Sequence, residues 1–293
     1  MLMALASDDV GSAGPIVGGP TRRRPWAWAV LGVVLLTAVA VIGTAYGRYL
    51  LRSRPGPRSM ASALKSFREV PTITSPVSLG LPAPDPGVYE LHGQGAEHIS
   101  FPPNSQGDGA IMPASVVGLA HGCWRWHVDY NVAHWEEYDF CPDGAGLVQV
   151  ANRNWQAWDF GTVKVKNSAA FSCQPPLPIL RAVPVVGQVV DQSCTGTNTA
   201  VSGLTAASGP LMVIGVQSLS VGGIAVTTVH ELEQTVLRGS QKGHATEDWW
   251  FEARTGLPVR MERHIDLATA SPLGAINYDE SGWWQLASMT ASS

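Results

Sequence analysis

The chain has few charged residues. Only 14% of its 293 residues are Asp, Glu, Lys or Arg, whereas 45% are apolar. This balance excludes an intrinsically disordered protein, which stays unfolded because it has too little apolar surface to bury. The 31 Gly and 21 Pro residues show no three-residue period, so a collagen-like chain is excluded as well. A folded core is expected.

Complete catalytic and metal-binding motifs are also missing. His230 begins an H-E-x-x-H pattern, but Gln234 stands where the second zinc-binding imidazole is required. Residues 62–65 match S-x-x-K without the S-D-N and K-T-G motifs that accompany it, and Gly93-x-Gly95 lacks a third glycine. No G-x-S-x-G elbow and no C-x-x-C pair occur. We therefore expect no cofactor, no metal and no catalysis, and keep a hydrolase with an unrecognised site as an alternative.

Two acidic clusters contain histidine. The first comprises His127, His134, Glu136, Glu137, Asp139 and Asp143, and the second His244, Glu247 and Asp248. Such groups can act as acid and base or bind a divalent cation through oxygens. In the first cluster we interpret them as solvated charge on the wet face of a hairpin, and the second is ambiguous.

The charges are unevenly distributed along the chain. Residues 1–84 carry 9 Lys+Arg and 3 Asp+Glu, whereas residues 85–293 carry 10 and 20. A basic leading segment suits anionic lipid headgroups, and an acidic body is repelled by phosphate backbones. The composition argues against nucleic acid as a partner.

A long apolar run lies near the start. Residues 26–47 contain no charged residue. As a helix they span about 33 Å, close to the hydrocarbon thickness of about 30 Å. The alternative is a cleaved export signal, since Arg22, Arg23 and Arg24 precede the run, but such signals have apolar stretches of about 7–15 residues. We predict a retained transmembrane helix that binds the lipid bilayer.

The orientation of this helix in the membrane is predicted from the domain that follows it more than from the arginines on either side of it. Three arginines precede the run, but Arg48, Arg52, Arg54 and Arg58 follow it, so the positive-inside rule is nearly balanced. Long domains translocate largely regardless of charge, and disulfides persist outside the reducing cytosol. We predict a single-pass plasma membrane protein with a cytoplasmic N-terminus and an extracytoplasmic C-terminal domain.

The four cysteines predict two disulfides. Residues 123–141 alternate as a hairpin, and a turn at residues 131–134 sets Cys123 opposite Cys141 or its neighbour. Facing residues of an antiparallel ladder lie within the distance that a disulfide tolerates. Cys123–Cys141 is therefore expected, and by elimination Cys173 pairs with Cys194.

The remaining sequence predicts four regions. They are a short basic cytoplasmic tail over residues 1–25, the transmembrane helix over 26–47, a Pro-rich juxtamembrane stalk with a short helix over 48–86, and a β domain over 87–290. Seven prolines between residues 52 and 87 predict an extended spacer. Beyond Pro86 a two-residue period with Gly and Asn turns predicts an antiparallel sheet, with strands that include 158–165, 185–191 and 275–287.

Tryptophan is unusually frequent. The simplest interpretation is that these tryptophans pack in the core of the sheet. Two tryptophans adjacent in the sequence, however, place one ring on each face of a strand, so both faces must be covered by another part of the protein or by a ligand. The predicted ligand-binding residues are Trp124, Trp126, Tyr130, Trp249, Trp250, Trp283 and Trp284.

The strand-turn-strand sequence at 248–260, Asp-Trp-Trp-Phe-Glu followed by Arg-Thr-Gly-Leu-Pro-Val-Arg, resembles the ending of exported lipid-carrier domains. These are lipoprotein-localisation-factor domains and related mycobacterial lipoprotein carriers, and the 211–229 hairpin around Gly222 fits the same pattern. The resemblance implies a curved half-barrel around an acyl-binding cavity. The chain also resembles membrane-anchored envelope proteins of high-GC actinobacteria, a likeness that implies no function.

Together these features predict a mainly β fold with one transmembrane helix and a half-barrel-like exported domain. We expect an envelope protein that binds an apolar, lipid-like ligand or another envelope component. The alternative binding partner is a cell-wall glycan stacked on exposed tryptophans.

Overall fold

Two compact units make up the protein, a helical unit up to Arg48 and a barrel domain from Tyr49 to Ser293. The structure is a computed structural model that describes residues 25–52, 54–71, 73, 81–271 and 274–293. Apart from Pro25, the predicted basic tail lies outside the described residues.

The first unit contains α1 (Pro25–Leu50) as far as Arg48, and the last two residues of the helix belong to the second unit. Its segment Val33–Leu50 has a mean hydropathy of 1.6 and is long and apolar enough to cross a membrane, a test that a signal sequence also passes. The hydroxyls of Thr37 and Thr44 donate to the carbonyls of Val33 and Ala40, each at 2.9 Å. These polar groups are satisfied within the helix, as a bilayer requires.

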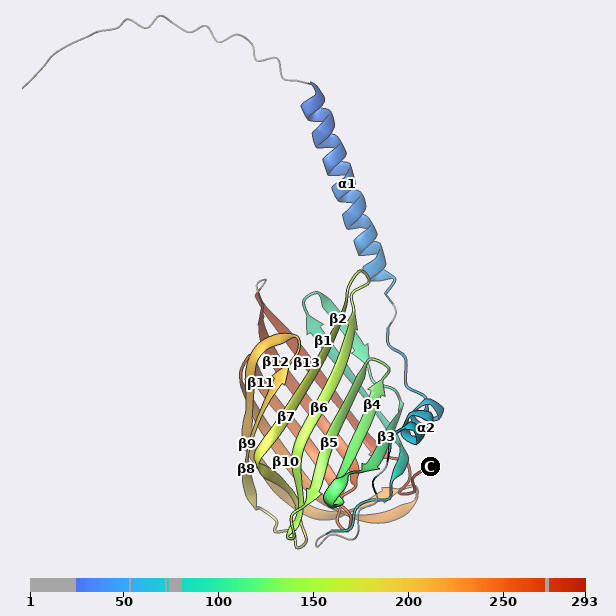
Figure 1. The fold of residues 1–293 in the computed structure, drawn as a ribbon, viewed down its shortest axis with the longest axis vertical. Helices are drawn as coiled ribbons and strands as arrows, with labels where there is room; N and C mark the ends of the chain where they lie inside the picture. The colour runs from blue at the N-terminus through green and yellow to red at the C-terminus, as the bar shows by residue number, and fades with distance from the viewer. Residues whose placement is uncertain (1–24, 53, 72, 74–80, 272–273) are drawn as a thin grey trace, which may run out of the picture. The chain divides into compact units, whose positions relative to one another are not determined.

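The second unit is built almost entirely from antiparallel strands (Figure 1). Two short helices accompany them, α2 (Met60–Glu69) and the 3₁₀ turn η1 (Ala120–Gly122). The strands are β1 (Gly87–Ser100), β2 (Pro103–Gly107), β3 (Ile111–Gly118), β4 (Trp124–Asn131), β5 (His134–Pro142), β6 (Gly146–Asp159), β7 (Lys164–Arg181), β8 (Val189–Asn198), β9 (Val201–Val221), β10 (Ile224–Gly239), β11 (Gln241–Glu252), β12 (Pro258–Ser271) and β13 (Gly274–Leu286).

The sheet closes on itself. Its 13 strands follow chain order except that β2 and β3 share one edge of β1, and β1 pairs along its other edge with β13. The result is a 12-strand barrel. The predicted half-barrel is therefore wrong in extent, although the mainly β antiparallel class is confirmed. Closure removes the two exposed edges that a half-barrel would leave.

Alternation along the strands decides which residues face the interior. In β4, Trp124, Trp126 and Val128 are buried inside the barrel, while Arg125 and His127 lie on its outer face. This is the two-residue period that the sequence predicts for this hairpin.

Both predicted disulfides are present. Cys123 pairs with Cys141 at a Cα–Cα distance of 4.1 Å, and Cys173 with Cys194 at 4.0 Å. Trp124 faces Phe140 in the β4–β5 ladder, so the first bridge closes the end of that hairpin. The second joins facing residues of β7 and β8.

Two predicted strands contain turns. Residues 158–165 are the hairpin between β6 and β7, where Gly161 has a φ of 82° and its N–H donates to Asp159. Residues 185–188 likewise form a turn before β8, with Gly187 at a φ of 82°. In both cases a glycine in the left-handed region turns an apolar run that otherwise has strand character.

The segment that connects α1 to β1 is attached to the barrel wall. We call its described residues 49–52 and 54–69 the strap. Arg52 donates to Asn104 of β2 at 3.1 Å, Arg58 pairs with Asp129 of β4 at 3.1 Å, and α2 packs on β1 and β3. Ser59 caps α2 by accepting from the backbone N–H of Ser62.

Closure of the barrel predicts a specific sensitivity at Gly93 of β1. A Cβ there would lie 2.2 Å from the Trp283 carbonyl oxygen of β13, whereas a Cβ at Gly215 of β9 meets nothing within 4 Å. We expect Gly93→Ala to lower the free energy of unfolding by about 1–3 kcal/mol and Gly215→Ala to change it little. Urea unfolding of the full chain in detergent, followed by tryptophan fluorescence, measures both. Equal stability of the two variants would contradict the β1–β13 pairing.

Candidate functional site

A cavity of about 430 Å³ occupies one end of the barrel interior. Residues of the β1–β2, β6–β7 and β12–β13 hairpins line it, and these hairpins lie at the same end of the barrel (Figure 1). The volume falls in the range typical of small-molecule sites. Because the lining comes from most of the barrel strands, the cavity exists only in the closed barrel.

Apolar side chains form most of the wall near this rim. Inward positions of six strands supply them, since every second residue of a strand faces the interior. They include Ile99 of β1, Trp158 of β6, Val165 of β7, Leu237 of β10, Ile265 and Leu267 of β12, and Ile276 of β13.

The floor of the cavity is polar. It is formed by Glu136, Tyr138, Gln156, Gln192, Glu233, Glu247, Tyr278 and Glu280. A molecule in the cavity would therefore place an apolar part against the rim and a polar end against the floor.

Arg263 of β12 lies behind this floor and pairs with two of its carboxylates. Its Nη1 lies 2.6 Å from Glu136 Oε2, and its Nη2 pairs with Glu280. Its guanidinium carbon lies 4.3 Å from the ring centroid of Tyr130. Burial would raise the pKa of Glu136, but the charges of Arg263 and His134 outweigh it and lower that pKa. For Glu280 burial dominates over Arg263 and raises the pKa to about 7.

A second carboxyl pair lies on the strands next to Arg263, where Glu247 of β11 faces Arg263 of β12 in the ladder. Glu233 of β10 and Glu247 of β11 face each other in the ladder. Gln192 donates to Glu233 at 2.8 Å, and Trp249 donates to Glu247 at 3.2 Å. Burial, reinforced by the charge of Glu233, raises the pKa of Glu247 to about 8. Burial likewise raises the pKa of Glu233, so both carboxyl groups hold their protons more tightly than exposed ones do.

A fully buried histidine lies beside Arg263 and its carboxylates. His134 of β5 has Nδ1 3.1 Å from Glu97 Oε1 and Nε2 3.9 Å from Glu136 Oε1. Burial would lower the pKa of His134, but the charges of Glu97, Glu280 and Glu136 raise it to about 9. One imidazole nitrogen and carboxylate oxygens of Glu97 and Glu280 lie within 4.8 Å of one another.

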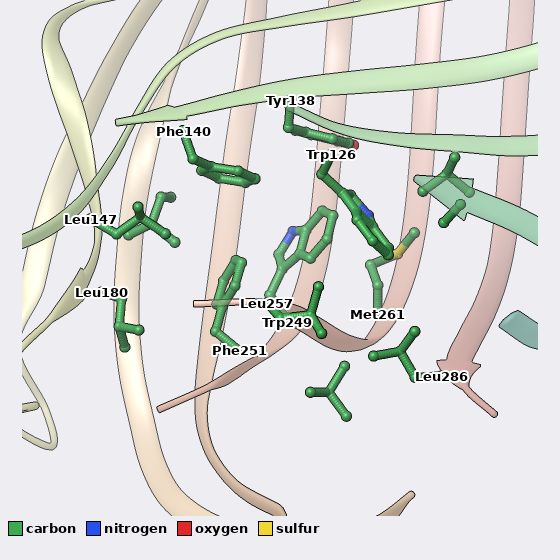
Figure 2. Close-up of a cluster of buried hydrophobic side chains, with 14 of the residues drawn as sticks. Trp126, Tyr138, Phe140, Leu147, Leu180, Trp249, Phe251, Leu257, Met261 and Leu286 are labelled. Atoms are coloured by element: carbon green, nitrogen blue, oxygen red, sulfur yellow. The ribbon is translucent and has the colours of Figure 1, made fainter. Parts of the chain in front are cut away.

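Below the polar floor, aromatic residues fill the barrel (Figure 2). Five of the seven predicted ligand-binding residues, Trp124, Trp126, Tyr130, Trp249 and Trp284, are buried here. Trp126 and Trp284 have ring centroids 5.9 Å apart, and Trp249 and Trp284 the same distance. These rings close the far end of the barrel beneath the floor.

The other two predicted residues, Trp250 and Trp283, lie on the outer face. His230 stacks on Trp250 at 4.2 Å, and the Arg260 guanidinium carbon lies 5.2 Å from Trp250 and 5.6 Å from Trp283. Trp283 is 37% exposed. None of the seven predicted residues lines the cavity, and their role in binding stays a prediction.

The acidic clusters of the sequence divide between the two faces of the sheet. His134 and Glu136 point inward, whereas His127, Glu137 and Asp139 form an outer network with Arg125 and Arg153. Asp143 pairs with Arg181 outside this network. In the second cluster only Glu247 reaches the cavity, while Asp248 contacts His230 at 2.7 Å on the outer face and His244 is exposed.

The incomplete motifs do not form a site. His230 and Gln234 lie in strand β10, so they lack the helical spacing of a zinc peptidase. Ser62 and Lys65 lie on α2 of the strap, outside the barrel interior.

Sequence reasoning missed Glu97, Gln156, Glu233, Arg263 and Glu280. Each is polar at an inward position of a strand, and Arg263 shows the pattern best, with apolar inward neighbours in Met261-x-Arg263-x-Ile265. That pattern marks buried polar groups only once the inward face of each strand is known.

Comparison with known proteins adds little. No family model matches the chain, and no curated protein matches it. Among solved structures it is similar to the hypothetical lipoprotein YmcC from Escherichia coli K12, with 12% identity and a TM-score of 0.32 over 78% of this chain and 97% of that one. At this TM-score the similarity carries no functional argument. The resemblance to lipid carriers and actinobacterial proteins gains no support from sequence comparison.

The ion pairs of Arg263 predict that replacing this residue lowers stability by an amount that depends on pH. Replacing it with Met leaves Glu136 and Glu280 buried without their cation, so we expect a loss of about 3–5 kcal/mol in the free energy of unfolding at pH 8. Acidification protonates those carboxyl groups, so the deficit shrinks towards pH 5.5. Arg260→Met on the outer face is the matched control. Denaturant unfolding at both pH values measures the effect, and a deficit that grows with acidification would contradict it.

Replacing His127 is expected to lower stability with the opposite pH dependence. Burial would lower the pKa of His127, but Asp129 and Glu137 raise it to about 9. A raised pKa stabilises the folded state fully below the unfolded pKa of about 6.5, and this stabilisation is lost as the pH rises through 9. We expect His127→Gln to lose up to about 3 kcal/mol at pH 6 and far less at pH 10.

The control for this variant is His264→Gln, which removes an exposed histidine from β12. Thermal or urea unfolding at the two pH values gives the comparison. A His127→Gln deficit of equal size at pH 6 and pH 10 would show that the ion pairs contribute no proton-linked stability.

Proposed function

We propose that this protein is a single-pass membrane protein whose barrel domain holds one small lipid-like amphiphile and performs no catalysis. The cavity is the observation that carries the proposal. Its wall is apolar near the rim, and its floor holds hydrogen-bonding and acidic groups. Such a gradient fits a ligand with an apolar chain and a polar end.

The floor favours a neutral or cationic polar end. Glu136, Glu233, Glu247 and Glu280 all reach the cavity, and Arg263 is already paired with two of them. An anionic end would meet carboxyl groups with no Lys, Arg or His among the described lining residues. An amine or hydroxyl end would instead donate hydrogen bonds to them.

The strap supports a membrane-derived ligand. Tyr49 donates to the carbonyl of Pro103, and Arg52 donates to Asn104, beside the β1–β2 hairpin whose Phe101 and Pro102 line the cavity. The strap therefore contacts the barrel domain at the cavity rim. An apolar molecule would enter through this same rim.

The two disulfides support an extracytoplasmic barrel. Both bridges join strands of the barrel domain, and bridges of this kind form and persist in oxidising compartments. With α1 as anchor, the N-terminus is then cytoplasmic and the protein belongs to the cell envelope.

A glycan-binding role has less support. Stacking on a sugar needs a platform of exposed rings, and among the described tryptophans of the barrel only Trp283 has a large exposed fraction. Trp250 is covered by His230 and Arg260.

Native mass spectrometry of the full chain released from detergent tests the proposal, with dodecylamine and dodecanoic acid as probes. We expect one dodecylamine per chain and weaker binding of dodecanoic acid. Ala245→Trp places an indole in the cavity, so affinity should fall at least about tenfold, or 1.4 kcal/mol. Ala225→Trp adds the same ring at an exposed position of β10 and should leave binding unchanged. Equal binding by both variants would contradict the cavity as the site.

A further inference from the structure

We propose that Glu97 of β1, His134 of β5 and Glu280 of β13 bind one divalent transition metal ion of the Zn²⁺ class inside the barrel. Each residue offers a ligand atom, and the three atoms lie within 4.8 Å of one another. All three residues are buried. Imidazole nitrogen and carboxylate oxygen are the ligands that Zn²⁺ takes besides thiolate.

The histidine gives an independent reason to expect an ion. His134 is 0% exposed, and neither of its ring nitrogens has hydrogen-bond geometry with a described group. Its Nδ1 nevertheless lies 3.1 Å from Glu97 Oε1. Two ligand atoms that each lie about 2.0–2.2 Å from one tetrahedral ion have a separation close to this. A metal ion would satisfy a buried nitrogen that otherwise carries a desolvation penalty.

Surrounding side chains hold the carboxylate ligands in place. Gln106 and Gln156 donate to the two oxygens of Glu97, each at 2.8 Å, and the single Tyr278 hydroxyl lies within hydrogen-bond distance of both Glu97 and Glu280. On the other side of the imidazole, His134 Nε2 faces Glu136 Oε1 at 3.9 Å. Hydrogen-bonded carboxylate ligands and a carboxylate behind the histidine are common features of metal sites.

The formal charge of the cluster also calls for a cation. Three carboxylates, Glu97, Glu136 and Glu280, surround the single guanidinium of Arg263 in this part of the described barrel. Asp108, close to the same groups, adds a further acidic side chain. Buried charges that lack a partner are strongly destabilising.

The cavity offers a route to this site. Glu280 belongs both to the cluster and to the cavity floor. Three protein ligands leave a fourth position of a tetrahedral ion open, as in sites where zinc holds water or another small ligand. The inference goes beyond the proposed ligand function and does not depend on it.

The test uses the full chain in detergent, stripped with a chelator and dialysed against Zn²⁺, with bound metal measured by plasma mass spectrometry. We expect one Zn²⁺ per chain. His134→Gln and Glu280→Gln should each lower the affinity at least about tenfold. His127→Gln is the matched control, because it removes an imidazole from the outer face of the adjacent strand β4 and should bind as the native chain does.

A measurement on the native chain covers the case in which the buried variants fail to fold. Co²⁺ loaded into the stripped protein should give visible ligand-field bands that Zn²⁺ abolishes, and X-ray absorption should show nitrogen and oxygen ligands at about 2.0–2.2 Å. Absence of metal uptake by folded native protein, or native affinity in folded His134→Gln, would overturn the site. Dodecylamine binding measured with chelator present reports on the proposed ligand function separately.

Discussion

The pairing of Arg263 with Glu136 and Glu280 is the interaction on which the interior of the barrel depends. It joins β12 to β5 across the barrel and to β13 beside it. Three buried charged groups are costly to desolvate, and they persist only when each is paired and hydrogen-bonded. Tyr130 and Tyr138 meet this requirement by donating to Glu136 at 3.0 and 2.9 Å. Both walls of the barrel are thereby held at a fixed separation.

This polar layer divides the interior into two halves of different character. On one side, large aromatic rings pack against one another in the hydrophobic core (Figure 2). On the other, smaller side chains such as Ala169, Ala207 and Ala245 leave the cavity. A barrel of this size would be filled by side chains or hollow depending only on the volumes of its inward residues. Here both outcomes occur within one barrel.

The predicted spacer is partly a structural element of the barrel domain. Prolines exclude continuous helix in the strap, but Arg52 and Arg58 bind the barrel wall and α2 packs on β1 and β3. The strap thus fixes where the chain enters the domain, at the cavity rim. The resulting combination of a tethered rim, an apolar wall and a carboxyl floor is the physical basis of the proposed lipid-like ligand.

The sequence by itself determined the local features of this protein. Length and lack of charge define α1, alternation in Trp124–Tyr130 defines a two-faced hairpin, and strand register brings Cys123 to Cys141. Closure of the barrel and the composition of the cavity floor came only from the tertiary structure. Pairing of β1 with β13 joins residues nearly the whole domain apart, and no local pattern specifies it. Glu97, His134, Arg263 and Glu280 come together because closure places their strands around one interior, a long-range consequence that residue spacing does not encode.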